Sequence, residues 1–150
     1  MVEGFRNDIT DATKYGPPSV PPINAINNEF GLIQHTPPLP DNPTHSDLEE
    51  LNLNIPLPLD DENGKIDSSA RLLVYVFLHG GGLAVGSNWY PQYGAASLTK
   101  TSIEKRKPMI GITINYRLGV TGFMISKELR SQGYKANNGF HDRRTAMRWI

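Results

Sequence analysis

Residues 72 to 78 form an uninterrupted apolar run, Leu-Leu-Val-Tyr-Val-Phe-Leu, and glycines follow it within two residues. A run of this length that is rich in β-forming side chains predicts a strand buried on both faces. Residues 109 to 115 predict a second buried strand by the same reasoning. The stretch between them, from Ala95 to Lys107, has helical character and is stopped by Pro108. Strands linked by a helix indicate an α/β fold with a mainly parallel sheet.

A further strand is expected before this unit. Leu51–Ile55 alternates apolar and polar residues, which predicts a strand with one covered face. The polar stretch Asp60–Lys65 contains Asn63-Gly64, a strong turn pattern. Because this turn is short, we expect the strand to pair antiparallel with the next strand in the sequence, which makes the sheet mixed.

Two short helices are expected after the second buried strand. Ser126–Gln132 predicts one of them, closed by Gly133. Asp142–Ile150 predicts the other, with Asp142 as its N-terminal cap. Three apolar residues of this helix share one face: Ala146, Trp149 and Ile150. Since the chain stops inside the helix, we expect the domain to continue beyond residue 150.

Proline divides the chain, because ten of the twelve prolines fall at or before Pro58. Proline has no amide donor and fixes φ, so this stretch up to Pro58 cannot be mainly helix or central sheet. A disordered leader is one interpretation of this segment. We favour an extended arm, residues 1–50, that belongs to the same domain as residues 51–150 and lies on it. The expected apolar anchors of the arm are Tyr15, Phe30, Leu32, Ile33 and Leu39.

Composition narrows the classes of partner. Fifteen basic and fifteen acidic residues cancel, which removes the main electrostatic argument for nucleic acid or an anionic membrane. The sequence has no cysteine, and its four histidines show no ligand spacing, so we expect no metal and no cofactor. No apolar run is long enough to span a bilayer, and the first eight residues lack the apolar centre of a signal peptide. These features favour a cytoplasmic location and leave the oligomeric state open.

The loop from His79 to Gly86 admits four interpretations. A phosphate-binding P-loop fails because Ser87 stands where that pattern requires lysine. A dinucleotide pattern fails because Val85 stands where the third glycine belongs. A flexible turn that happens to be rich in glycine is the third interpretation. The fourth is an oxyanion hole, in which backbone amides stabilise the anionic oxygen of a tetrahedral intermediate.

A His-Gly-Gly-Gly loop after a strand is the form of oxyanion hole that lipases and esterases use. In those enzymes the partner donor is the amide that follows the serine of a Gly-x-Ser-x-Gly turn. That pattern does not occur in the 150 residues. The loop therefore predicts one half of a hydrolase active site.

Three other segments carry a specific family resemblance. Residues 115–123, Asn-Tyr-Arg-Leu-Gly-Val-Thr-Gly-Phe, resemble the Asn-Tyr-Arg-Leu-Gly-x-x-Gly-Phe motif of the type B carboxylesterase and cholinesterase family. Residues 137–150 resemble that family's Asn-x-Gly-Leu-x-Asp-Gln segment and the Ala-Leu-x-Trp-Val that follows it, and residues 51–55 resemble its Leu-x-Leu-Asn-Val strand. The motifs stand in the family's order. The resemblance implies the N-terminal part of an α/β-hydrolase fold.

The resemblance assigns roles within the glycine loop. It implies that the amides of Gly81 and Gly82 donate to the oxyanion and that Gly80 permits the turn. His79 is expected to pack or to form a hydrogen bond behind the loop. It does not match the catalytic histidine of the family, which lies far downstream.

Residues outside the loop receive more modest roles. Trp89 and Tyr90 are candidates to line the acyl or alcohol pocket, with plain packing as the alternative. Asn115 and Arg117 are expected to be structural, with Arg117 in an ion pair with an acidic residue outside this chain. Asp142 is expected to be structural rather than a catalytic acid.

Two positions depart from the family pattern. Glu50 stands in place of the cysteine before the first strand, so the early disulfide of secreted members is missing. Arg143 stands in place of a glutamine, which leaves the packing there open.

The sequence therefore predicts a serine carboxylic-ester hydrolase that acts on a small-molecule ester. Its Ser–Glu/Asp–His triad is expected beyond residue 150, because the chain ends before any nucleophile turn. The alternatives are a catalytically inactive cholinesterase-like binding or adhesion protein and an inactive gene fragment.

Overall fold

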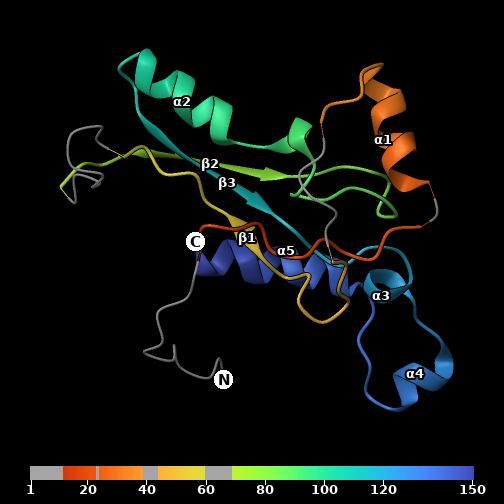
Figure 1. The fold of residues 1–150 in the computed structure, drawn as a ribbon. Helices are drawn as coiled ribbons and strands as arrows, with labels where there is room; N and C mark the ends of the chain where they lie inside the picture. The colour runs from red at the N-terminus through yellow and green to blue at the C-terminus, as the bar shows by residue number, and fades with distance from the viewer. Residues whose placement is uncertain (1–11, 23, 39–43, 60–68) are drawn as a thin grey trace.

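The computed structural model describes residues 12–22, 24–38, 44–59 and 69–150. These residues form a three-stranded sheet of order β1-β3-β2 with helices on both of its sides (Figure 1). In chain order the elements are α1 (Ala25–Ile33), β1 (Leu53–Asn54), β2 (Leu73–Leu78), the 3-10 turn η1 (Pro91–Tyr93), α2 (Ala96–Glu104), β3 (Met109–Ile114), α3 (Gly119–Phe123), α4 (Lys127–Ser131) and α5 (Asn138–Trp149). The fold class is α/β, as predicted.

The sheet is mixed. β2 and β3 run parallel, with Leu78 opposite Ile114, and α2 forms the crossover between them. β1 runs antiparallel to β3, with Leu53 opposite Ile114. The mixed sheet is confirmed, but the expected pairing of the first strand with the next strand in the sequence is wrong. The crossover places β3 in the centre, where both of its edges find a partner. The predicted turn at Asp60–Lys65 lies outside the described residues.

The expectation that β2 is buried on both faces is also wrong. Leu73 is 76% exposed, whereas Ile114 of β3 is 0% exposed. The reason is the position of each strand in the sheet. β2 lies at the edge, and among the described residues no strand pairs with its outer side. The apolar core therefore gathers around β3 instead.

α2 packs on β3 through the buried side chains of Thr99 and Ser102. The Ser102 hydroxyl donates to the Thr99 carbonyl at 2.6 Å and accepts from the Met109 amide at 3.1 Å. This arrangement ties the helix to the start of β3. The helix predicted over residues 95–107 is confirmed, although it ends at Glu104.

Both of the expected C-terminal helices are present. Ser126 caps α4, because its hydroxyl accepts a hydrogen bond from the Leu129 amide at 3.2 Å. The prediction that Asp142 caps the last helix is wrong. α5 begins four residues earlier, at Asn138, and the Asp142 carboxylate is bound by Arg117 instead. No helix within the described ranges is long and apolar enough to cross a bilayer.

The predicted apolar face of α5 borders a groove. Ala146 and Trp149 line this groove, of about 450 Å³, together with Leu51 and Leu53 from the β1 segment. Ile150, the third predicted member of the face, follows the end of the helix. α5 and α2 lie on opposite sides of the sheet (Figure 1).

The N-terminal arm lies against the folded part through hydrogen bonds. The Ser19 hydroxyl donates to the carbonyl of Tyr116 at 3.1 Å. Nδ2 of Asn52 donates to the carbonyl of Pro17 at 2.8 Å. These contacts attach the arm to Tyr116, two residues after β3, and to Asn52, just before β1.

The apolar anchors expected in the arm are largely wrong. Phe30 is buried, as predicted, and Leu39 lies outside the described residues. The other three expected anchors are exposed: Tyr15, Leu32 and Ile33. A polar contact anchors α1 instead, because the buried Glu29 accepts a hydrogen bond from the Tyr93 hydroxyl at 2.6 Å. The helix α1 itself was not predicted.

Candidate active site

The glycine loop, residues 79–86, leaves the carboxyl end of β2, and residues 115–118 leave the carboxyl end of β3. Because these strands are parallel neighbours, both segments lie at the same edge of the sheet, the edge at which α/β proteins bind ligands. The Gly119 amide donates to the Leu83 carbonyl at 2.7 Å. The loop is therefore joined directly to the start of α3.

A tight turn shapes the loop. The Gly81 carbonyl accepts hydrogen bonds from the amides of Ala84 at 3.1 Å and Val85 at 3.0 Å. Gly81 has a φ of 105°, and a Cβ there would collide with the Val85 carbonyl. Gly86 has a φ of 110°, and a Cβ there would collide with the His79 ring. Glycine is therefore required at both positions, and the requirement at Gly86 was not predicted.

Gly80 and Gly82 differ from these two glycines. No neighbouring atom lies within 4 Å of a Cβ built at either position, and both residues are exposed. Within the part of the chain that the structure describes, the amides of Gly81 and Gly82 donate to no acceptor. Two adjacent unused amides beside an exposed glycine can bind an anionic oxygen.

His79 lies behind the loop, as expected. It is 2% exposed, and its Nδ1 lies 3.0 Å from the Gly80 carbonyl oxygen. Since that oxygen can only accept, Nδ1 carries the proton and donates it. Burial lowers the pKa of the imidazole below its usual 6.5, and the charge of Arg143 adds to this effect. The ring is therefore neutral at pH 7.

Tyr116 holds His79 through two contacts, a ring stack and a hydrogen bond. Its ring stacks on the imidazole with centroids 4.3 Å apart and an angle of 12° between the planes. Its hydroxyl donates to the His79 carbonyl at 2.7 Å. Burial raises the pKa of the hydroxyl, which therefore keeps the proton that it donates. Tyr116 belongs to the Asn-Tyr-Arg motif, but spacing alone did not indicate this role.

Arg117 forms its ion pair within this chain, so the expected outside partner is wrong. Its Nε and Nη2 bind the two carboxylate oxygens of Asp142 at 2.8 Å and 2.7 Å. The Arg117 amide also donates to the same carboxylate at 3.2 Å. Asn115 is structural as expected, since its Nδ2 donates to the Glu50 carbonyl at 2.8 Å. Asp142 is thus held in a bidentate pair and joins α5 to the end of β3.

Arg143 packs on aromatic rings. Its guanidinium carbon lies 3.9 Å from the centroid of the Tyr116 ring and 5.0 Å from that of Phe140. Distances of this kind are favourable cation–π contacts. The departure from the family pattern at this position therefore has a definite structural partner.

Trp89 and Tyr90 are both buried, at 5% and 3% exposure, and pack edge to face with centroids 6.2 Å apart. Trp89 borders a cavity of about 320 Å³ that it shares with arm residues, among them Tyr15 and Glu49. None of the three loop glycines at 80–82 lines that cavity. A role for the two aromatic residues in an acyl or alcohol pocket stays a prediction.

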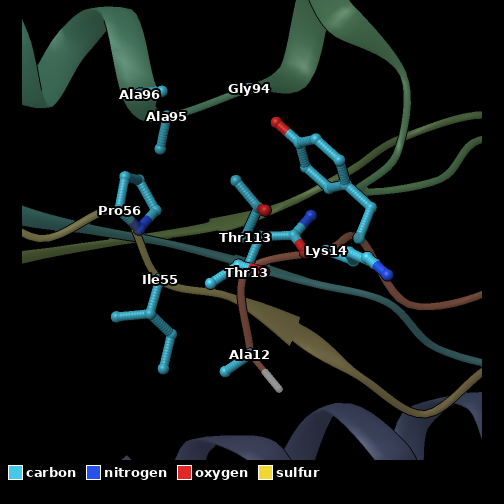
Figure 2. A pocket seen from close by; sticks show the side chains of 11 residues that line it. Ala12, Thr13, Lys14, Ile55, Pro56, Gly94, Ala95, Ala96 and Thr113 are labelled. Atoms are coloured by element: carbon cyan, nitrogen blue, oxygen red, sulfur yellow. The ribbon is translucent and has the colours of Figure 1, made fainter. Parts of the chain in front are cut away.

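A second cavity, of about 230 Å³, lies on the α2 side of the sheet. Figure 2 shows that three parts of the chain border this cavity. They are Ile55 with Pro56, the segment that ends just before α2, and the arm segment that contains Lys14. It contains no residue of the glycine loop. Among the described residues, no three His, Asp or Glu side chains are grouped so that they could hold a metal ion.

Comparisons with known proteins give similar sequences and a similar fold. The family model described as "Carboxylesterase family" matches residues 5–150. A secreted lipase of Arthroderma benhamiae is 37% identical over 100 residues, which are 67% of this chain and 17% of the lipase. An inactive carboxylesterase-like protein, VdtD of Byssochlamys spectabilis, is 31% identical over 156 aligned positions, covering 97% of this chain and 26% of that protein.

Among solved structures, a thermophilic pNB esterase is similar in fold. Its TM-score is 0.68 at 27% identity, and the similarity covers 95% of this chain and 25% of the esterase. The chain spans about a quarter or less of the length of these three proteins.

Proposed function

The chain belongs to the carboxylesterase family, and from that membership we propose that the whole protein hydrolyses small-molecule carboxylic esters with a serine nucleophile encoded beyond residue 150. The glycine loop is the observation that carries this proposal. Its two unused amides, at Gly81 and Gly82, are the donors for the oxyanion, and Gly80 supports the loop by permitting its turn.

Both donors are held in place before any substrate arrives. The carbonyl of the peptide plane that carries the Gly81 amide is that of Gly80, which accepts from His79. The carbonyl of the plane that carries the Gly82 amide is that of Gly81, which accepts from Ala84 and Val85. When a nucleophile adds to the ester, the carbonyl oxygen gains the negative charge that these amides face. Donors that need not reorganise stabilise the transition state most effectively.

The remaining groups must come from outside these 150 residues, which contain no Gly-x-Ser-x-Gly pattern. We expect this pattern within about thirty residues after Ile150, at the next turn from strand to helix. The amide after its serine would be the third oxyanion donor. Trp89 and Tyr90 are proposed as walls of the acyl or alcohol pocket, because they follow the loop closely in the sequence.

A second candidate function has a specific observation in its favour. VdtD, a relative that is 31% identical and aligns with 97% of this chain, is named as inactive. A protein of this family can therefore lack the activity, and the second candidate for this chain is an inactive binding protein. The intact pair of unused loop amides favours the hydrolase.

The coding sequence beyond Ile150 separates the two candidates. The hydrolase requires a Gly-x-Ser-x-Gly turn there. The same turn with another residue in place of serine contradicts the hydrolase and supports the inactive binding protein.

A variant of Gly82 tests the role of the loop in the protein encoded by the whole reading frame. Gly82 has a φ of 62°, which a β-branched residue strongly resists, so Gly82→Val should displace the donor amide. We expect turnover of a short-chain aryl ester to fall on the order of 10²-fold or more, as it does when one oxyanion donor is lost.

Gly133→Val is the matched control for this experiment. Gly133 also has a positive φ, of 86°, and no neighbour within 4 Å of a built Cβ, but it follows α4. The control should lose stability without losing turnover per folded molecule. Equal turnover in the Gly82 variant and the wild type would place the oxyanion donors elsewhere.

A further inference from the structure

We propose that Arg143 is a positioning residue for the oxyanion loop, acting through Tyr116 and His79 on the Gly81 amide. This inference rests on the proposed function, because it gives the loop amide its catalytic meaning. Arg143 does not itself belong to the loop. It is connected to the loop by a stack of three planar groups and by two hydrogen bonds.

The stack begins at α5. The Arg143 guanidinium lies 3.9 Å from the Tyr116 centroid, and the His79 ring lies 4.3 Å from the same centroid. Two groups this close to one ring cannot share a face of it, so Tyr116 is held between the guanidinium and the imidazole. A planar cation over an aromatic face gains electrostatic attraction as well as packing.

Two hydrogen bonds connect the stacked rings to the loop. The Tyr116 hydroxyl fixes the His79 carbonyl at 2.7 Å, and His79 Nδ1 fixes the Gly80 carbonyl at 3.0 Å. The Gly80 carbonyl and the Gly81 amide belong to the same peptide plane. A tilt of the imidazole therefore rotates the Gly81 amide, and a hydrogen bond to the carbonyl also polarises that amide.

The guanidinium is itself placed by its helix. Phe140, one turn earlier on α5, lies 5.0 Å from it. The neighbouring residue Asp142 binds Arg117 at the end of β3. Arg143 consequently presents a fixed plane to Tyr116.

The experiment uses the protein encoded by the whole reading frame. Arg143→Gln removes both the charge and the stacked plane, whereas Arg143→Lys keeps the charge and loses the plane. Arg144→Gln, a change at the exposed neighbour on the same helix, is the matched control. Active sites are titrated first, so that rates refer to folded molecules only.

We expect kcat for a short-chain aryl ester to fall on the order of 10-fold in Arg143→Gln with KM unchanged, because a misaimed donor weakens transition-state binding alone. Inhibition by an aryl trifluoromethyl ketone, whose carbonyl oxygen becomes an oxyanion when a nucleophile adds to it, should weaken by the same factor. Arg143→Lys should give an intermediate loss, and Arg144→Gln should match the wild type.

A readout that needs no activity accompanies the kinetics. Amide hydrogen exchange of residues 79–86 should be faster in Arg143→Gln, while exchange of α5 stays as in the wild type. A purely structural role would lower the number of titrated sites and leave kcat per site unchanged.

The outcomes separate the two proposals. Wild-type kcat per site and wild-type loop exchange in Arg143→Gln overturn the positioning role, even if Gly82→Val has confirmed the hydrolase. A wild-type protein that hydrolyses no ester overturns the proposed function. In that case, unchanged loop exchange rejects the coupling of Arg143 to the loop, and faster exchange supports it.

Discussion

At the scale of single residues, Glu50 is the clearest case of a group that opposes folding. Its side chain is 1% exposed, and its Oε1 has no hydrogen-bond partner in the described structure. Burial raises the pKa of this carboxyl above its usual 4.5, and the nearby Ser19 and Arg117 oppose the shift without cancelling it. The ionised form is therefore better solvated in the unfolded chain than in the folded one.

This shift predicts a pH-dependent gain from Glu50→Gln. Below pH 4.5 the carboxyl is protonated in both states, so wild type and variant should be similarly stable. As the pH rises through the raised pKa of the folded state, the wild type loses stability and the glutamine variant does not. Chemical unfolding at pH 4 and pH 7 measures the difference, which should favour the variant at pH 7 only.

Glu49→Gln is the control, because Glu49 is the exposed neighbour. It should change stability little at either pH. A Glu50→Gln variant that is no more stable than the wild type at pH 7 would contradict the prediction.

The residues of the candidate site differ in how far a sequence can predict them. The glycines at 80–82 are visible because their pattern is local, and a glycine loop after the strand was predicted. The need for glycine at 86 was not, because the His79 ring occupies the space where its Cβ would lie. The Arg143–Tyr116 contact joins residues 27 positions apart on two elements, and no spacing rule reports such a contact.

At the scale of elements, the Arg117–Asp142 pair fixes α5 against the end of β3. The Asp142 side chain is 6% exposed and the Arg117 side chain 31% exposed, so the pair is partly shielded from water. Three hydrogen bonds reach this one carboxylate. Charge-assisted bonds of this geometry are among the stronger ones in proteins.

Removing the carboxylate should loosen the attachment of α5. Asp142→Ala leaves a half-buried guanidinium and an amide without acceptors, and we expect a loss of about 2–3 kcal/mol in the free energy of unfolding. Asp142→Asn keeps one acceptor oxygen and should lose less. Denaturant unfolding checks both values, with the exposed Asp47→Ala as control. An alanine variant as stable as the wild type would show that α5 is held by other contacts.

The positions of the helices and strands in the sequence were predicted better than the pairing of the strands and the capping of the last helix. The strands at 73–78 and 109–114 and the helices at 96–104 and 127–131 agree with the expected segments within a few residues. The partner of β1 was missed, because alternation reports a covered face and says nothing of which strand lies beside it. The start of α5 was placed too late, because aspartate is a typical N-terminal cap and Asp142 was taken as one. The Asp142 carboxylate binds Arg117 instead.

At the scale of the whole molecule, the outer edge of β2 is the most exposed part of the sheet. Leu73, Val74 and Tyr75 are all exposed, and no described strand pairs with that edge. An unpaired apolar edge promotes pairing between molecules.

We therefore expect the 150-residue chain to self-associate, and Val74→Lys to reduce this, because charge on an edge strand opposes pairing. Val120→Lys introduces the same charge at an exposed valine of α3 and should have little effect. Sedimentation velocity across a range of concentrations compares the three proteins. Equal association of all three would show that β2 is not the contact.

The glycine loop is held by contacts within this part of the protein. Among the described residues, the hydrogen bonds that aim the two loop amides come from residues between 79 and 119. Under the proposed function, these amides would be aimed without help from the part of the protein that supplies the nucleophile. Such an arrangement suits a split enzyme, in which one piece carries the amides that bind the oxyanion and another piece carries the nucleophile. We therefore expect a cut after α5 to leave the two loop amides of the first piece aimed as they are in the uncut chain.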